Sequence, residues 1–350
     1  MKKKRSLIIV FGLIVLLVIG GIAAYSISGL PVDKGDEKKI LVRIEQGSGT
    51  GQIAALLKKE DLIRSEGFFK LRSKVEGYDG KYKAGTYAFT RSMSAKEMMT
   101  AIRDGDTAGK TFQVIEGMTI DKVADQLEGE GIVSKKDFYY EVENGKFDYR
   151  FMKYLPKGPT RLEGFLYPNT YEVPVDATAH EVVDIMLKGF DDAVGDKYYK
   201  EAEKQGKTIY DVIVVASIVE REASKKGEKP KVSSVIYNRL KIDMPLQMDS
   251  IISYIHKEDK IRATYSDIAV DSPYNPYTNK GLPPGPICSP GVDAIEAALH
   301  PAETKYLYFV ATPKLDGTNV YSETYEEFLK DKEAFDKAYE KYIKENPGEK

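Results

Sequence analysis

The most distinctive chemical feature of the chain is a carboxylate, Glu220, at the end of a long apolar run. From Asp211 the chain reads DVIVVASIVERE, and Ser217 is the one polar residue between Asp211 and Glu220. Burial disfavours the charged form of a carboxyl group, and the negative end of a helix dipole acts in the same direction. We therefore expect Glu220 to hold a proton near neutral pH, as a donor to a leaving oxygen must.

Glu220 also has an ordinary structural interpretation. A buried carboxylate is usually paired with a cation, and Arg221, Arg239 or a neighbouring lysine is available for this. From the residues alone, the ion pair and catalysis both remain open. Glu222 projects about 200° away around the same helix, so the two carboxylates do not face one bond. We interpret Glu222 as structural.

Other catalytic chemistries lack a supporting motif. The three histidines (His180, His256 and His300) are scattered, and there is no HExxH and no cysteine cluster, so we predict neither a metal site nor a cofactor. No GxSxG sequence marks a nucleophilic serine. The single cysteine, Cys288, excludes an intramolecular disulfide, and its position among prolines indicates a packing residue.

The elements that position Glu220 can be read from capping and turn residues. Thr208 and Asp211 form a helix-start pattern, and Pro230 opens a second helix. A loop rich in Pro, Gly, Asn and Tyr covers 271–291, and loops of this length in compact domains are usually functional. The expected order is a helix to about 223, a helix after Pro230, the segment 245–255, this loop, a helix over 292–299, a strand over 305–312 and a charged helix from 323.

An internal repeat precedes these elements. The segment from Ile40 aligns with the segment from Lys110 without gaps, and each predicts a strand, a glycine turn, an amphipathic helix and a second short helix. The glycine-rich run at Gly47 resembles a phosphate loop, but its counterpart GMTID at Gly117 has lost two of the three glycines. We therefore predict a strand-to-helix turn. The second copy carries about 14 extra residues before Thr170, which we expect to be functional rather than packing.

The N-terminus combines a basic tip with an apolar stretch. Lys2–Arg5 precede about 19 uncharged residues from Leu7 to Tyr25, enough to span a bilayer core of roughly 30 Å. A cleaved signal peptide fits the same pattern, but the apolar part is long and the cleavage box is poor. We predict an uncleaved transmembrane helix with its N-terminus in the cytoplasm and the remainder of the chain outside.

The charge balance limits the partners of that outer portion. Without the four N-terminal cations, 48 Lys and Arg remain against 54 Asp and Glu, a formal charge of −6. A nucleic-acid-binding protein needs a basic field, so we predict no nucleic-acid partner.

Several segments, taken in order, resemble the endolytic murein transglycosylases of the YceG-like family. They are LEGFLYPNTY from Leu162, ASIVERE from Ala216, VIYNRL from Val235, PLQMD from Pro245, SPYNPYTNKGLPPGPI from Ser272, and HPA with YLYFVA from His300. The resemblance extends from about Ile40 to the end of the chain. Three positions depart from the family pattern: Ser250–Ser253 replace a Thr-Val pair before Tyr, Pro276 replaces Thr, and Ser289 stands where Asn is usual.

The resemblance implies an α+β fold with an N-terminal transmembrane helix, small LysM-like βααβ subdomains and a larger mixed α/β catalytic domain. The expected boundaries are a basic tail over 1–5, the transmembrane helix over 6–27, a linker over 28–38, a LysM-like subdomain over 39–108 and the catalytic domain over 109–345, with a second LysM-like repeat at about 110–190.

The activity implied is that of a lytic transglycosylase, a carbon–oxygen lyase acting on a polysaccharide. Such an enzyme cuts the β-1,4 bond between N-acetylmuramic acid and N-acetylglucosamine within nascent peptidoglycan strands, without water. The product ends in a 1,6-anhydro sugar, and the cut terminates glycan elongation. The implied partners are peptidoglycan glycan strands, the cell membrane, and peptidoglycan synthases with the elongation or division machinery.

By the same resemblance, Glu220 is the catalytic acid and base. Because the muramoyl C6 hydroxyl supplies the nucleophile, no second carboxylate is required, unlike in a hydrolase. The candidates for the saccharide groove are Glu163, Asn238, Gln247, Asp249, Tyr274 and Asn275. Hydrogen bonds that brace loops are the alternative role, equally suited to Asp249 and Asn275.

Two alternative functions remain open from the sequence. In one, the chain is a non-catalytic peptidoglycan-binding membrane protein and the helix ending at Glu220 belongs only to its core. In the other, the chain is a glycoside hydrolase in which Asp249 or Glu163 activates a water molecule.

Overall fold

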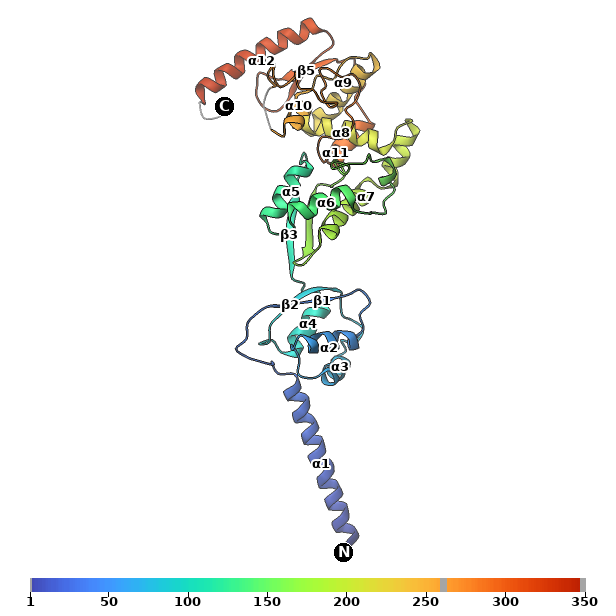
Figure 1. Cartoon of the computed structure of the whole chain (residues 1–350), viewed down its shortest axis with the longest axis vertical. Helices are drawn as coiled ribbons and strands as arrows, with labels where there is room; N and C mark the ends of the chain where they lie inside the picture. Colours follow the sequence, from blue (N-terminus) through green and yellow to red (C-terminus); the bar gives the residue numbers. More distant parts are fainter. Residues whose placement is uncertain (1, 259–262, 347–350) are drawn as a thin grey trace. The chain divides into compact units, whose positions relative to one another are not determined.

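A computed structural model describes residues 2–258 and 263–346 of the chain (Figure 1). The chain divides into two compact units, and each is described here by itself. The first comprises Met1–Lys110 with Glu172–Asp176, and the second comprises Thr111–Tyr171 with Ala177–Lys350. The architecture is mixed α/β, as predicted.

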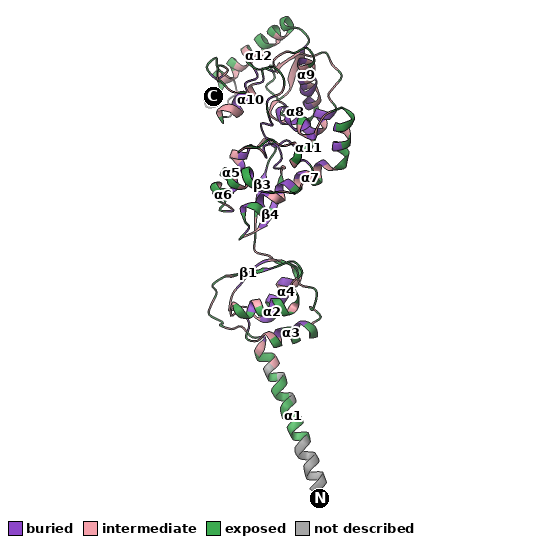
Figure 2. Ribbon diagram, turned by 45° about the vertical axis from the view of Figure 1, so that its right-hand side comes forward, coloured by how far each residue is buried: buried purple, intermediate pink, exposed green. Residues whose placement is uncertain are grey.

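The N-terminal helix α1 (Lys2–Ser28) is the candidate membrane anchor. Its stretch Phe11–Ser28 is long and apolar enough to cross a bilayer, and none of it is buried inside the protein. Figure 2 shows this part of α1 as mostly exposed, and Leu17 is 75% exposed. Apolar side chains that face outward over such a stretch are typical of a membrane-embedded segment.

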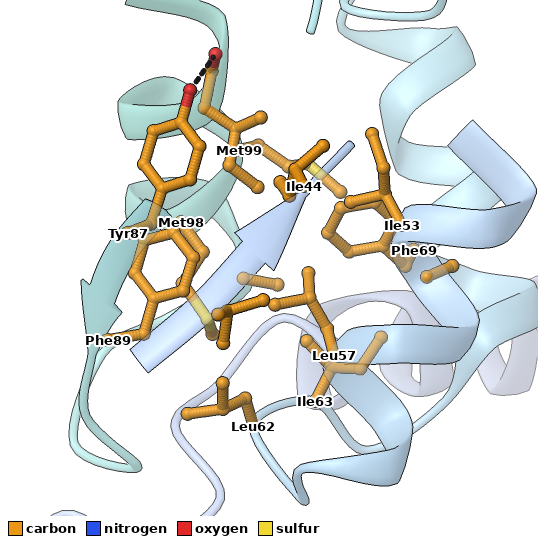
Figure 3. Packing of buried hydrophobic residues seen from close by; sticks show 14 residues of the cluster. Ile44, Ile53, Leu57, Leu62, Ile63, Phe69, Tyr87, Phe89, Met98 and Met99 are labelled. Atoms are coloured by element: carbon orange, nitrogen blue, oxygen red, sulfur yellow. Dashed lines mark hydrogen bonds between the residues drawn. The ribbon is translucent and has the colours of Figure 1, made fainter. Parts of the chain in front are cut away.

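The rest of the first unit is a small α/β core. The strands β1 (Ile40–Ile44) and β2 (Gly85–Phe89) pair antiparallel, with Ile40 opposite Phe89 and Ile44 opposite Gly85. Three helices pack with this strand pair: α2 (Thr50–Lys59), α3 (Glu66–Val75) and α4 (Ala95–Asp104). Figure 3 shows the buried side chains that they share, among them Ile53, Leu57, Phe69, Tyr87, Phe89, Met98 and Met99.

The order of elements then recurs, as the internal repeat predicts. The strands β3 (Gly109–Val114) and β4 (Asn169–Pro174) form a two-stranded sheet. Between them along the chain lie α5 (Ile120–Gly129), α6 (Lys135–Asn144) and the short 3-10 helix η1 (Met152–Tyr154). The turn glycines of the two copies share one left-handed conformation, with φ of 81° at Gly47 and 82° at Gly117. The prediction of a strand-to-helix turn is thus confirmed.

The extra residues of the second copy do contribute to packing, which corrects our expectation. Phe151, Leu162, Phe165 and Leu166 are fully buried, and the ring of Phe165 lies 4.7 Å from that of Phe190. Gly164 has φ of 85°, and a Cβ there would lie 2.8 Å from Ile213 and 2.7 Å from Pro286. The segment therefore belongs to the core on which the helix Ile209–Glu222 rests.

The second unit continues with helices packed around α8 (Ile209–Glu222). Helix α8 contacts α7 (Ala179–Lys204), α9 (Lys229–Lys241), α10 (Asp249–His256) and α11 (Val292–Leu299). A 3-10 turn, η2 (Lys226–Glu228), precedes α9. Figure 2 shows α8 and α11 as largely buried. The final helix, α12 (Tyr325–Glu345), has no buried residue.

The C-terminal strand differs from the prediction. Instead of one strand over 305–312, the structure has a hairpin of β5 (Tyr308–Ala311) and β6 (Asn319–Ser322). Thr312 N donates to Thr318 O at 2.9 Å, and Gly317 takes φ of 78° in the connection. Asp316-Gly317 is a hairpin signal that the sequence analysis missed.

Candidate active site

The helix α8 carries Glu220 on its last turn. Thr208 and Asp211 cap its first turn reciprocally: Thr208 N donates to the Asp211 carboxylate at 2.9 Å, and Asp211 N donates to Thr208 Oγ1 at 3.2 Å. Every residue from Val212 to Val219 is buried, as the apolar sequence predicts. A helix held on all sides fixes the position of the side chain at its end.

The carboxylate of Glu220 is held at both oxygens. Oε1 accepts a hydrogen bond from Lys229 Nζ at 2.7 Å, and Oε2 accepts one from Gly291 N at 2.9 Å. The side chains of Glu220 and Lys229 are 9% and 10% exposed. Glu220 is therefore ion-paired, which is the structural interpretation that the sequence analysis left open beside catalysis.

Three helices meet at this carboxylate. Lys229 is the first residue of α9, where Pro230 follows in the first turn, and Gly291 is the N-cap of α11. Free N–H groups and a positive dipole end at a helix N-terminus favour an anion, which Glu220 supplies. The sequence analysis allowed for a lysine partner without naming Lys229, because nothing in the sequence brings residues 220 and 229 together before α8 and α9 pack.

The long loop over 271–291 is fastened to α8 next to this site. Ile287 N donates to Ser217 Oγ at 3.0 Å, and Ser217 Oγ donates to Val214 O at 2.8 Å. Cys288 is fully buried, with Sγ 3.3 Å from Ser217 O, and burial raises the pKa of its thiol. Its interpretation as a packing residue is confirmed.

A second carboxylate, Glu116, lies beside the same loop and was missed in the sequence. A Cβ on Gly291 would lie 2.8 Å from Glu116 Cγ and 3.5 Å from Glu220 Oε2. The turn that carries Glu116 pairs with the loop, because Gly117 N donates to Ser289 O at 2.9 Å and Ser289 N donates to Met118 O at 2.8 Å. These are backbone bonds, so the departure from the family pattern at Ser289 leaves them intact.

Glu163, a predicted groove residue, lies in the interior. It is 2% exposed, and both of its oxygens accept from Ile120 N, at 3.2 and 3.3 Å. Burial raises the pKa of Glu163 to about 8, against hydrogen bonds from Ile120, Tyr254 and Gly164 that lower it. This is the environment of a carboxylate that caps α5, and it leaves Glu163 without access to a glycan or to bulk water.

Asp249 and Gln247 lie where the 245–249 segment meets the long loop. Asp249 accepts from Tyr277 OH at 2.6 Å and from Ala263 N at 3.2 Å. Gln247 is exposed, has φ of 47°, and its N–H donates to Pro276 O at 3.1 Å. The side chain of Gln247 is thus accessible, whereas that of Asp249 braces the loop.

The two predicted asparagines also brace the structure. Asn275 is fully buried, and its amide donates to Ile268 O and Val270 O at 2.9 and 2.8 Å. Asn238 donates to Thr304 O and Tyr306 O, each at 3.0 Å. Both contacts are the loop-bracing alternative that the sequence analysis described.

Tyr274, the last of the predicted groove residues, is half-buried. Its ring centroid lies 5.3 Å from that of Tyr254, and burial raises the pKa of Tyr274 to about 12. The Tyr254 hydroxyl in turn bonds Glu163. The residues predicted from the sequence therefore fall into two groups. Glu220, Gln247 and Tyr274 are the candidates for contact with a ligand. The others hold the surrounding structure: Glu163, Asn238, Asp249 and Asn275.

Glu222 has the structural role that we predicted. It accepts from Ser250 N at 3.2 Å in the first turn of α10, and burial raises the pKa of its carboxyl. The negative charge of Asp249 acts on Glu222 as a further, smaller cause. The two carboxylates at the end of α8 thus serve different neighbours.

A cavity of about 470 Å³ lies elsewhere in the second unit. Its lining comes from the α6 and α7 regions and includes Ser134, Tyr140, Glu141 and His180. Neither Glu220 nor any of the predicted groove residues lines this cavity, so it lies outside the candidate active site.

Comparison with known proteins gives one consistent family. The sequence profile of the YceG-like family matches residues 42–334. A Bacillus subtilis (strain 168) protein named endolytic murein transglycosylase is 36% identical over 333 residues, which cover 91% of this chain and 91% of the relative. A protein of the same name from Streptococcus pneumoniae serotype 2 is 32% identical over 331 residues, 85% of this chain and 59% of the relative.

A solved structure agrees with these relatives. The crystal structure of a YceG-like protein from Listeria monocytogenes is 33% identical in sequence and superposes with a TM-score of 0.57. The match covers 84% of this chain and 99% of that one. From a profile match over most of its length and relatives above 30% identity, we conclude that this chain belongs to the YceG-like family.

Proposed function

We propose that this protein is an endolytic murein transglycosylase, a lyase that cuts the glycan strands of peptidoglycan within their length. The single observation that carries the proposal is the Glu220 carboxylate, held at the end of a buried helix by Lys229 and Gly291 in a chain of this family. The names of the relatives with 36% and 32% identity support the substrate.

In the proposed reaction Glu220 acts first as an acid and then as a base. In its acid form it gives a proton to the oxygen of the β-1,4 bond, so that the bond from this oxygen to muramoyl C1 breaks. The C6 hydroxyl oxygen then bonds to C1 and returns its proton to Glu220. The anhydro end forms with no water consumed, and the carboxyl group recovers its proton.

The two hydrogen-bond partners of Glu220 assist the first of these steps. When the proton leaves, the negative charge that appears on Glu220 lies 2.7 Å from an ammonium and 2.9 Å from a backbone N–H. Donors already aimed at a developing charge lower the barrier because they need no reorganisation.

The remaining proposals concern location and binding. We propose that α1 anchors the chain in the cell membrane in a single pass, with Lys2–Arg5 on the cytoplasmic side and the second unit outside. The two repeats, each with a two-stranded sheet and two helices between the strands, would be LysM-like modules that contact the glycan. Peptidoglycan synthases and the elongation or division machinery are the proposed protein partners.

Product analysis tests the reaction. The full-length chain in detergent is incubated with purified murein in ¹⁸O-labelled water, and the new ends are identified by mass spectrometry. The proposal predicts anhydromuramoyl ends without ¹⁸O. Reducing ends carrying ¹⁸O would show a hydrolase, and an absence of new ends would show a binding protein. Glu163 and Asp249 are already engaged in protein contacts, which disfavours the hydrolase.

A further inference from the structure

The exposed carboxylate of Glu116 has no role in the reaction proposed above. It sits on the turn between β3 and α5, and it is the side chain that a Cβ on Gly291 would meet first, at 2.8 Å. The same position lies 3.4 Å from Glu116 Oε1 and 3.5 Å from Glu220 Oε2. The carboxylates of Glu116 and Glu220 thus both lie next to Gly291, and the nearer Glu220 oxygen is the one that accepts from Gly291 N.

The backbone fixes this juxtaposition. Residues 117 and 118 exchange two hydrogen bonds with Ser289, and Glu220 accepts from Gly291 N on the same loop strand. The turn bearing Glu116 is therefore bonded to Ser289, and the end of α8 is bonded to Gly291, two residues further along the same loop. An exposed side chain on a fixed turn keeps its charge near the site while remaining accessible to a ligand.

Glu116 is also uncommitted within the protein. In the described part of the chain its carboxylate makes no hydrogen bond and no ion pair, whereas Glu163, Glu222 and Asp249 all have protein partners. Glu116 does face Tyr167: burial, then the charges of Glu116 and Asp293, raise the pKa of that hydroxyl. A half-buried tyrosine and a carboxylate without a partner thus border the same space.

The charges around Glu220 give Glu116 a chemical role. The ammonium of Lys229 lies 2.7 Å from Glu220 Oε1, so one cation already lies at this site. Cleavage of a glycosidic bond passes through an oxocarbenium-like state, in which the sugar ring becomes positive. A carboxylate close to the sugar ring would attract that charge, whereas a cation opposes it.

We propose that Glu116 is a second carboxylate of the active site, which faces the sugar ring and stabilises its positive charge as the glycosidic bond breaks. This inference rests on the proposed transglycosylase function. Glu116 neither donates nor accepts a proton in it, so the reaction still consumes no water. Its effect falls on the transition state and therefore on kcat rather than on KM.

The test is Glu116→Gln, which keeps the shape and the hydrogen-bonding oxygen but removes the charge. The internal repeat offers a matched control, because the residue aligned with Glu116 in the first copy is Gln46, which is also exposed. Full-length wild type, Glu116→Gln, Gln46→Glu and the double variant are compared for kcat and KM on murein glycans, with Tm measured for each.

We expect Glu116→Gln to lower kcat about 100-fold, the usual effect of removing one electrostatic stabiliser, with KM changed less than about 3-fold and Tm unchanged. Gln46→Glu should leave kcat at the wild-type value and should not rescue the double variant. A kcat of Glu116→Gln within about 3-fold of wild type, or a rise in KM alone, would overturn the inference. If wild type itself formed no anhydro ends, the proposed function would fail instead.

Discussion

The carboxylate of Glu220 and the ammonium of Lys229 form a buried ion pair, with Oε1 and Nζ 2.7 Å apart. The pair joins the last turn of α8 to the first residue of α9. The pair compensates the charge at the end of an apolar helix and also holds the carboxylate in place. The charge is neutralised as in any protein interior, and its second oxygen is directed to Gly291 on the loop that carries the family motif.

The first prediction concerns Lys229. Lys229→Met leaves the Glu220 charge buried without its cation, and we expect it to lower the free energy of unfolding by about 3 kcal/mol. It should also lower kcat, because the carboxylate formed on proton donation is no longer stabilised. Urea unfolding and the rate of anhydro-end formation measure the two effects.

Lys229→Arg is the control for this prediction. Arginine keeps the positive charge with a different geometry, so it should recover most of the stability and a part of kcat. If the Lys229→Met and Lys229→Arg variants were equally active, Lys229 would have only a packing role.

The second prediction separates the two carboxylates of α8. Glu222 accepts from Ser250 N and is half-buried, so Glu222→Ala leaves that donor without its partner and should cost about 1–3 kcal/mol of stability. The specific activity of the folded fraction should stay near wild type. A loss of activity at full stability would instead assign Glu222 to the reaction.

The third prediction concerns pH and Glu163. The pKa of Glu163 is raised to about 8 by burial, from an ordinary value of 4.5. The folded state therefore binds this proton more tightly than the unfolded state. The associated stability is fully present below pH 4.5 and is lost as the pH rises towards 8, by an amount on the order of a few kcal/mol.

Glu163→Gln makes this dependence measurable. The difference in unfolding free energy between wild type and Glu163→Gln should fall steadily from pH 5 to pH 8, since only the wild type carries the titrating group. Urea unfolding at several pH values gives this difference directly. A constant difference over that range would show that Glu163 does not titrate there.

The fourth prediction concerns α1. Deleting residues 1–28 should move the protein from the membrane pellet to the soluble fraction, because the exposed apolar stretch Phe11–Ser28 is then absent. Protease added to intact protoplasts should digest the chain beyond residue 28 if the proposed orientation holds. Full protection until the protoplasts are lysed would contradict it.

Sequence patterns predicted the local elements well where capping and periodicity were strong. Helix α11 begins and ends at the predicted residues, and α8 begins after the predicted cap Thr208. The strand-to-helix turns at Gly47 and Gly117 were predicted from the repeat, and the structure adds that both glycines are left-handed. The hairpin of β5 and β6 was half missed, because β6 is short and its alternation is weak.

The arrangement around Glu220 was less predictable, because it depends on contacts between distant segments. Lys229 and Gly291 reach Glu220 only after three helices pack, and Glu116 arrives from the repeat through backbone bonds to Ser289. Motif matching also marked residues such as Asn275, whose side chain holds a loop rather than facing the surface. A motif thus identified the catalytic candidate but did not separate groove residues from the bracing around them.

The most direct test of the central claim is the product spectrum of Glu220→Gln. Glutamine keeps one of the two acceptor oxygens and cannot deliver or recover a proton, so the binding of murein should persist while the broken ion pair costs some stability. The full-length variant in detergent, incubated with murein, should form no anhydromuramoyl ends by mass spectrometry, with murein binding in a sedimentation assay near wild type. Anhydro ends appearing at the wild-type rate would contradict the account.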